Sequence, residues 1–159
     1  RVMRGDDAPP PPPADVSVDL PAFIPDDYIP SADAKLDVYR RLSAVTEVGA
    51  IDDVRDEVRD RFGALPPAAE AFFHVSRLRL IGGAIGVEGI LVRGDEARVT
   101  FHGSALPRMK PLSAAFRDVQ FQVDVRRVQP LSLKLTRLGG SPLLEGLVRA
   151  LRTIVSEER

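Results

Sequence analysis

Few residues of this chain could do chemistry of their own. It has two histidines, His74 and His102, and no cysteine among its 159 residues. Zinc sites combine several Cys, His or carboxylate ligands at characteristic spacings, and neither histidine has a partner at such a spacing. We therefore expect structural histidines and no metal site. The absence of cysteine also excludes disulfides and a thiol nucleophile, which fits a protein of the reducing cytoplasm.

Two other motifs resemble catalytic ones but stand in the wrong context. Ser104 follows a histidine and a glycine, yet a nucleophile elbow needs a glycine two residues after the serine, where this chain has Leu106. The three glycines of residues 82–86 resemble half a phosphate loop. Such a loop follows a strand and precedes a helix, whereas here the predicted order is helix, glycines, strand. The sequence thus predicts no catalytic residue, no cofactor and no enzyme activity in this chain.

A charged helix predicted from about Ile51 is a candidate binding surface. Glu57 and Asp60 are three residues apart and share a face of this helix. That face points away from the apolar stripe, which contains Val54 and Val58. A charge run of this kind is most often a solvated helix face, and the other interpretation is a small acidic docking patch. The residues alone leave both open.

Basic side chains gather later in the chain. Residues 1–70 carry 8 basic and 15 acidic side chains, whereas residues 104–137 carry 7 basic and 2 acidic ones, so a dipolar molecule is predicted. The basic stretch could contact phosphates or an acidic protein surface. It forms no dense cluster, and we do not expect direct nucleic-acid contact. Its members are Arg108, Lys110, Arg117, Arg126, Arg127, Lys134 and Arg137.

The first half of the chain predicts a linker, a strand and three helices. Residues 1–15 contain five consecutive prolines and predict a flexible linker, before a single domain with one core at residues 16–159. Apolar and polar residues alternate over residues 16–20, which is typical of a strand. Helices are predicted from the N-cap Ser31 to Gly49, from Ile51 to Gly63, and from Pro66 towards residues 82–83.

The second half predicts two hairpins and two helices. Strands are expected at residues 87–93 and 97–101, and again at 121–126 and 131–136, with a bend at Gln129 and Pro130. A short helix is expected at residues 107–116, and a last helix with Ser141 as N-cap and Pro142 at its first position. Strands and helices are segregated, which predicts a single α+β domain with a mainly antiparallel sheet and about five helices packed on it.

Three segments in register carry a resemblance to a known family. They are residues 20–30 (LPAFIPDDYIP), 36–42 (LDVYRRL) and 57–66 (EVRDRFGALP). Together they resemble the C-terminal domain of the bacterial transcription-repair coupling factor, Mfd. The resemblance is clear over residues 16–90, and beyond them it rests on position. Residues 82–83 depart from the family, because two glycines stand where helix-favouring residues are expected.

This resemblance implies a regulatory role for a piece of a longer, ATP-dependent DNA translocase. In the family, the domain packs on a UvrB-like module of the same chain and masks the UvrA-binding surface of that module. UvrA and RNA polymerase are then indirect partners, and no membrane is involved. Acidic residues of the family contribute to the masking contact, and the matching positions here are Glu57 and Asp60. The proline-rich start would be the tether to the motor.

Three other functions remain possible at this point. The same acidic patch could belong to a stand-alone protein-interaction domain that acts on another chain. The basic stretch at residues 104–137 could make a nucleic-acid-binding module, with binding that weakens steeply with salt. A hydrolase would require a cluster of carboxylates with perturbed pKa values that the sequence does not reveal.

Overall fold

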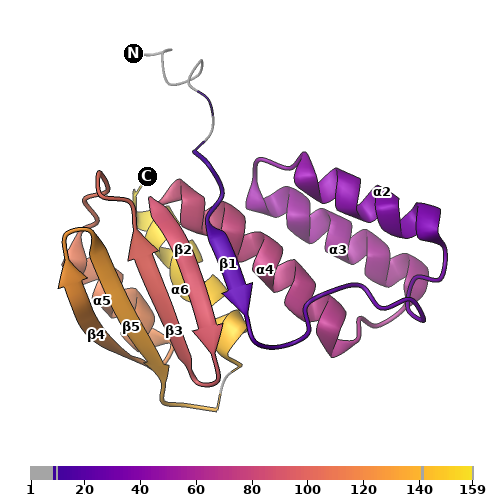
Figure 1. Ribbon diagram of the computed structural model, residues 1–159. Helices are drawn as coiled ribbons and strands as arrows, with labels where there is room; N and C mark the ends of the chain where they lie inside the picture. Colours follow the sequence, from indigo (N-terminus) through magenta and orange to yellow (C-terminus); the bar gives the residue numbers. More distant parts are fainter. Residues whose placement is uncertain (1–8, 10, 141, 159) are drawn as a thin grey trace.

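A five-stranded sheet and five helices make up the part of the chain that the computed structural model describes, which is residues 9, 11–140 and 142–158 (Figure 1). In chain order, the elements are β1 Asp15–Val18, α2 Ala32–Ser43, α3 Val48–Phe62, α4 Pro67–Ala84, β2 Val87–Arg93, β3 Glu96–Phe101, α5 Met109–Asp118, β4 Phe121–Val128, β5 Leu131–Arg137 and α6 Leu143–Glu158. The predicted α+β fold class, with about five helices, is confirmed.

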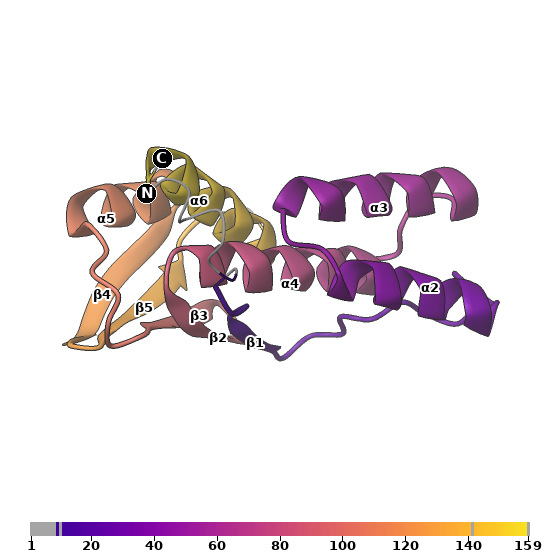
Figure 2. The same cartoon turned by 90° about the horizontal axis from the view of Figure 1, so that it is seen from above.

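The strands follow the order β1-β2-β3-β5-β4. β1 pairs with β2 in parallel, and the three other pairings are antiparallel. Helices α5, α6 and part of α4 cover one face of the sheet, and none of the described helices lies on the other face (Figure 2). We call this half of the molecule the sheet lobe. Helices α2 and α3 lie beside it and pack on α4, and together with residues 20–30 they form the helical lobe.

The described residues form two hydrophobic clusters, which corrects the prediction of one core. The larger cluster lies between the sheet and the helices that cover it. The smaller cluster belongs to the helical lobe and contains Ile24, Ile29, Val38, Ile51, Val54, Val58 and Phe73. Helix α4 serves both, because Phe73 belongs to the helical cluster while Leu78 and Ile81 belong to the sheet cluster. A helix buried on two sides has no single apolar stripe, so its sequence gives no sign of the division.

The sequence predicted several helix ends correctly from residues close to them. Ser31 caps α2, since its Oγ accepts a hydrogen bond from the backbone N–H of Ala34 at 3.1 Å. Gly63 ends α3 with a φ of +95°, a conformation that glycine adopts at little cost. Gly49 was predicted to end the first helix, but it lies in the first turn of α3. The earlier start of α3 brings Val48 against the sheet cluster, which explains the difference.

The two glycines near the end of α4 have a packing role. A Cβ on Gly83 would lie 2.2 Å from the carbonyl oxygen of Pro12, and one on Gly82 would lie 3.2 Å from the Cβ of Ala14. The N–H of Ala14 donates to the carbonyl of Arg79 at 2.8 Å, and Ala14 is fully buried. The glycines therefore let an earlier segment cross α4 closely. The contacts with the rest of the domain therefore begin at about residue 12, four residues before the predicted boundary. Residues 1–8 and 10 lie outside the described part, and the flexibility of the linker stays a prediction.

The other predicted boundaries shift by small amounts. β1 ends at Val18, because Asp19 turns away and its carboxylate accepts from the N–H of Gly94 at 2.7 Å. The short helix runs two residues later than predicted, as Met109–Asp118. Helix α6 begins at Leu143, one residue after Pro142, and the predicted N-cap at residue 141 lies outside the described residues.

Candidate docking surface

Helix α3 presents the two predicted docking residues to solvent. Ile51, Val54 and Val58 are 2%, 4% and 3% exposed and fix which face of the helix is buried. The side chains of Glu57 and Asp60 are 59% and 77% exposed. Their outward orientation follows from the spacing of the buried residues. Their role in binding stays a prediction.

Glu57 is held by an ion pair that the sequence did not predict. Arg41 of α2 donates hydrogen bonds to both carboxylate oxygens, from Nη1 to Oε2 and from Nη2 to Oε1, the second at 3.1 Å. Asp37, one turn earlier on α2, lies 3.9 Å from the same guanidinium group. The hydrogen bond from Arg41 lowers the pKa of Glu57, so the carboxylate stays ionised. The patch therefore spans α2 and α3, and its acidic charge is partly balanced.

Asp60 is held more loosely than Glu57. Its Oδ1 lies 3.8 Å from Nη2 of Arg59, which is the same distance as from that nitrogen to the carboxylate of Asp56. Both contacts are too long for hydrogen bonds and leave the side chain of Asp60 free to turn. Together with Asp37 and Glu57, this surface has four carboxylates, and four guanidinium groups partly balance them. Besides Arg41 and Arg59 these are Arg55, which pairs with both Asp56 and Glu70, and Arg61, whose charge acts on Glu57.

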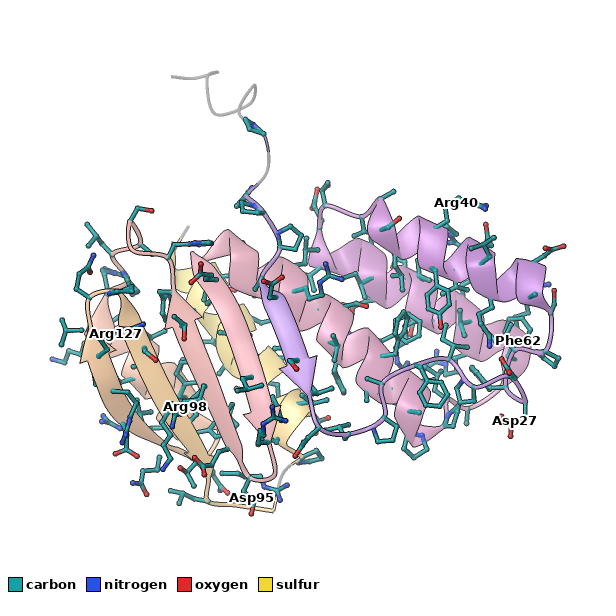
Figure 3. The ribbon with its side chains drawn as sticks, viewed as in Figure 1. Asp27, Arg40, Phe62, Asp95, Arg98 and Arg127 are labelled. Carbon is teal, nitrogen blue, oxygen red and sulfur yellow. The ribbon has the colours of Figure 1, made fainter. Side chains whose placement is uncertain are left out.

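The end of α3 is fixed by an aromatic contact with the irregular segment at residues 20–30. The hydroxyl of Tyr28 donates to the carbonyl of Gly63 at 2.6 Å, and its ring lies 6.0 Å from that of Phe62. The guanidinium carbon of Arg61 stands 4.9 Å from the centre of the Phe62 ring. Figure 3 labels Phe62 and Asp27 at this end of the molecule. Two segments that the sequence singled out therefore meet beside Asp60.

An ionic network that the sequence did not predict joins α3 to α4 and α6. Asp52 accepts from Nε of Arg77 and from Nη2 of Arg152, each at 2.7 Å. Burial alone raises the pKa of Asp52, but hydrogen bonds from Arg152 and Arg77 outweigh it and hold the pKa below its ordinary value. Arg77 is 7% exposed, so Asp52 balances a nearly buried charge. This network fixes the position of α3 on the rest of the molecule.

Neither histidine takes part in an assembled catalytic group within the described residues. Nδ1 of His74 lies 3.1 Å from Nη1 of Arg77, beside a hollow of about 960 Å³ between α3, α4 and α6. Burial, and then the charge of Arg77, lowers the pKa of His74 and favours the neutral ring. His102 follows the last residue of β3, and its Nδ1 is 4.0 Å from the carboxylate of Glu88.

The basic stretch divides into paired and unpaired members. On β5, Lys134 pairs with Glu96 at 3.3 Å and Arg137 with Asp95 at 2.7 Å. Nε of Arg127 donates to the carbonyl of Pro130 at 3.1 Å. The remaining members are exposed and make no ion pair within the described residues; they are Arg108, Lys110, Arg117 and Arg126. They lie on or beside α5 and β4, at the opposite end of the molecule from α3 (Figure 1).

The described residues lack two other features that could define a function. No group of three or more His, Asp or Glu side chains in that part of the chain could hold a metal ion. No helix there is long and apolar enough to cross a membrane.

The fold is similar to that of a known class of domain. It matches a solved structure described as "Crystal structure of C-terminal domain of transcription-repair coupling factor", with a TM-score of 0.81, over 93% of this chain and 95% of that one. At 15% identity, this likeness establishes the architecture alone. A family model, the TRCF domain, matches residues 18–111. The chain therefore belongs to the TRCF domain family, that of the C-terminal domain of transcription-repair coupling factor (Mfd), as its resemblance predicted.

Curated relatives agree with this assignment. The transcription-repair-coupling factor of Mycobacterium tuberculosis (strain CDC 1551 / Oshkosh) is 37% identical over 120 residues, which are 74% of this chain. That of Escherichia coli (strain K12) is 30% identical over 73 residues, or 46% of this chain. The chain spans 9% of the first relative and 6% of the second, so it corresponds to a small part of each.

Proposed function

We propose that this chain is the regulatory C-terminal domain of a cytoplasmic transcription-repair coupling factor and acts in transcription-coupled DNA repair as a lid. It packs on a UvrB-like module of the same protein and masks the surface through which that module binds UvrA. The parent protein is an ATP-dependent DNA translocase, and this domain itself catalyses nothing. UvrA and RNA polymerase are reached only through the parent. Membership in the family supports this role.

The observation that carries the proposal is the outward, ordered presentation of Glu57. Arg41 holds its carboxylate in one orientation, so binding loses little side-chain freedom there. Asp60, three residues on, extends the acidic surface. Exposed ion pairs contribute about 0–1 kcal/mol each and set orientation more than affinity. A contact of this kind suits a lid that must open.

The test measures binding of this chain to the purified UvrB-like module by calorimetry. Glu57→Ala together with Asp60→Ala should weaken binding about tenfold, which corresponds to about 1.4 kcal/mol. The matched control removes two carboxylates elsewhere, Glu88→Ala with Asp118→Ala, and should leave the affinity unchanged. In the parent protein, the first pair of changes should raise UvrA binding in the absence of nucleotide and polymerase.

Two results would contradict the proposal. If the unchanged chain does not bind the module, the proposed role as a lid is wrong. If it binds but the Glu57 and Asp60 variant binds equally well and keeps its circular dichroism spectrum, those two residues are not in the contact. Their face of α3 is then an ordinary solvated surface.

A further inference from the structure

Large apolar side chains are exposed at the end of the molecule farthest from α3. Leu106, in the connection between β3 and α5, is 87% exposed, and Val128, at the end of β4, is 77% exposed. Nε2 of Gln129 donates to the carbonyl of Gly103 at 2.7 Å and ties the β4–β5 turn to that connection. Val125, three residues before Val128, is 49% exposed. Apolar surface therefore continues from the connection onto β4.

β4 is also an open edge of the sheet. Among the described strands it pairs only with β5, so its outer side offers backbone N–H and C=O groups to solvent. All four of its last residues, 125–128, are exposed. Figure 3 labels Arg127 here, on the side of the molecule opposite Phe62. An open edge beside exposed apolar side chains is what strand addition by another segment requires.

The charge at this edge selects the partner. Arg126 and Arg127 stand on β4, and Arg108 and Lys110 lie at the start of α5. A second copy is disfavoured as the partner, because two β4 edges would bring four arginines together. The register irregularity between Val125 and Arg127 would affect any strand added to this edge in the same way, so the choice of partner rests on charge. An acidic partner has the opposite charge and meets no such repulsion.

We propose that the outer edge of β4, with Leu106, is a second docking surface that receives an extended, acidic protein segment with apolar residues at alternate positions. The backbone of this segment pairs with β4, its apolar side chains cover Val128 and Leu106, and its carboxylates meet Arg126 and Arg108. A phosphate backbone would use the same cations but leave the aliphatic side chains uncovered. This surface is separate from the one on α3, so the domain can hold two partners at opposite ends.

The probe is a fluorescein-labelled, end-capped ten-residue peptide of alternating Val and Glu, titrated by anisotropy against the whole chain at 150 mM salt. We expect saturable binding with a Kd of about 10–100 μM, which is usual for a small contact. Leu106→Ser with Val128→Ser should weaken it about tenfold, and so should Arg126→Glu. The matched control is Leu36→Ser on α2, because Leu36 is also an exposed leucine, at 53%, but lies in the helical lobe.

Three further ligands test the selection by charge, the strand addition and the choice of a protein partner over DNA. A peptide with Lys in place of Glu should not bind, and equal binding would overturn the selection by charge. A peptide interrupted by proline keeps its charge but cannot complete a strand, so equal binding by it would overturn strand addition. If a 20-base-pair DNA duplex binds at this edge, with loss on Arg126→Glu, and the acidic peptide does not, the surface is a nucleic-acid site and the proposal is wrong.

Discussion

The helical lobe and the sheet lobe are stabilised in different ways. Within the described residues, the helical cluster contains 7 buried side chains and the sheet cluster 24, so far less apolar burial holds the helical lobe. Ion pairs between helices supplement it, such as Arg41 with Glu57 and Arg55 with Glu70. Regions with few buried apolar contacts open locally at lower free energy. We therefore expect the lobe that carries the proposed lid contact to open first.

Phe73→Ala should lower the free energy of unfolding more than the substitutions that follow, and it tests the difference between the two lobes directly. Phe73 is completely buried in the helical cluster, and Phe→Ala changes at such sites cost about 3–5 kcal/mol. Hydrogen exchange should show loss of protection in α2 and α3 while β3 and β5 stay protected. Uniform loss of protection in both lobes would mean that the molecule unfolds as one unit, and the comparison would fail.

Gly83→Ala should have the next largest effect. Its Cβ would meet the carbonyl oxygen of Pro12, so backbone must move, and such overpacking costs up to about 3 kcal/mol. Gly49→Ala is the control, because nothing lies within 4 Å of a Cβ there and alanine is the better helix former. Urea unfolding should show destabilisation for the first change and a small gain for the second. Equal midpoints would show that residues 12–14 do not press on α4 in solution.

Asp52→Asn should cost about 1–2 kcal/mol, since two guanidinium groups lose their ionised acceptor. The change should also alter how the free energy of unfolding depends on pH. The pKa of Asp52 is lower in the folded than in the unfolded chain. The stability that the ionised Asp52 contributes is therefore complete above its unfolded pKa of about 3.9. It is lost as the pH falls through the folded pKa. Urea midpoints at pH 7 and pH 3 should thus differ less in the variant than in the unchanged chain.

Glu57→Ala with Asp60→Ala should have the smallest effect on folding. Exposed carboxylates on a helix contribute less than about 0.5 kcal/mol each, and alanine has the higher helix propensity. The melting temperature of this variant should stay within a few degrees of the unchanged chain. A larger drop would indicate that the pair between Arg41 and Glu57 holds α2 on α3, and the binding test above would then need Glu57→Gln in its place.

The sequence predicted the features that depend on near neighbours. Ser31 and Gly63 were placed correctly because a cap or a left-handed turn involves residues three or four positions away. The outward orientation of Glu57 followed from helix periodicity in the same way.

The features that it missed join residues distant along the chain. Asp52 and Arg152 are 100 positions apart, and Pro12 and Gly83 are 71 apart, so no local pattern relates either pair. The same holds for Arg41 and Glu57, 16 positions apart on two helices. The candidate residues and their outward orientation could thus be predicted from the sequence, whereas the charges that surround them needed the fold, and their role in binding stays a prediction.

The parallel pairing of β1 has a mechanical consequence. The chain enters the domain at Pro12, passes over Gly83 and continues directly into β1, which is bonded along its length to β2. A pull at Pro12 along the axis of this strand loads its backbone hydrogen bonds in shear, all at once, and does not peel them apart one by one. A load applied at Pro12 would therefore reach β2 through several hydrogen bonds together.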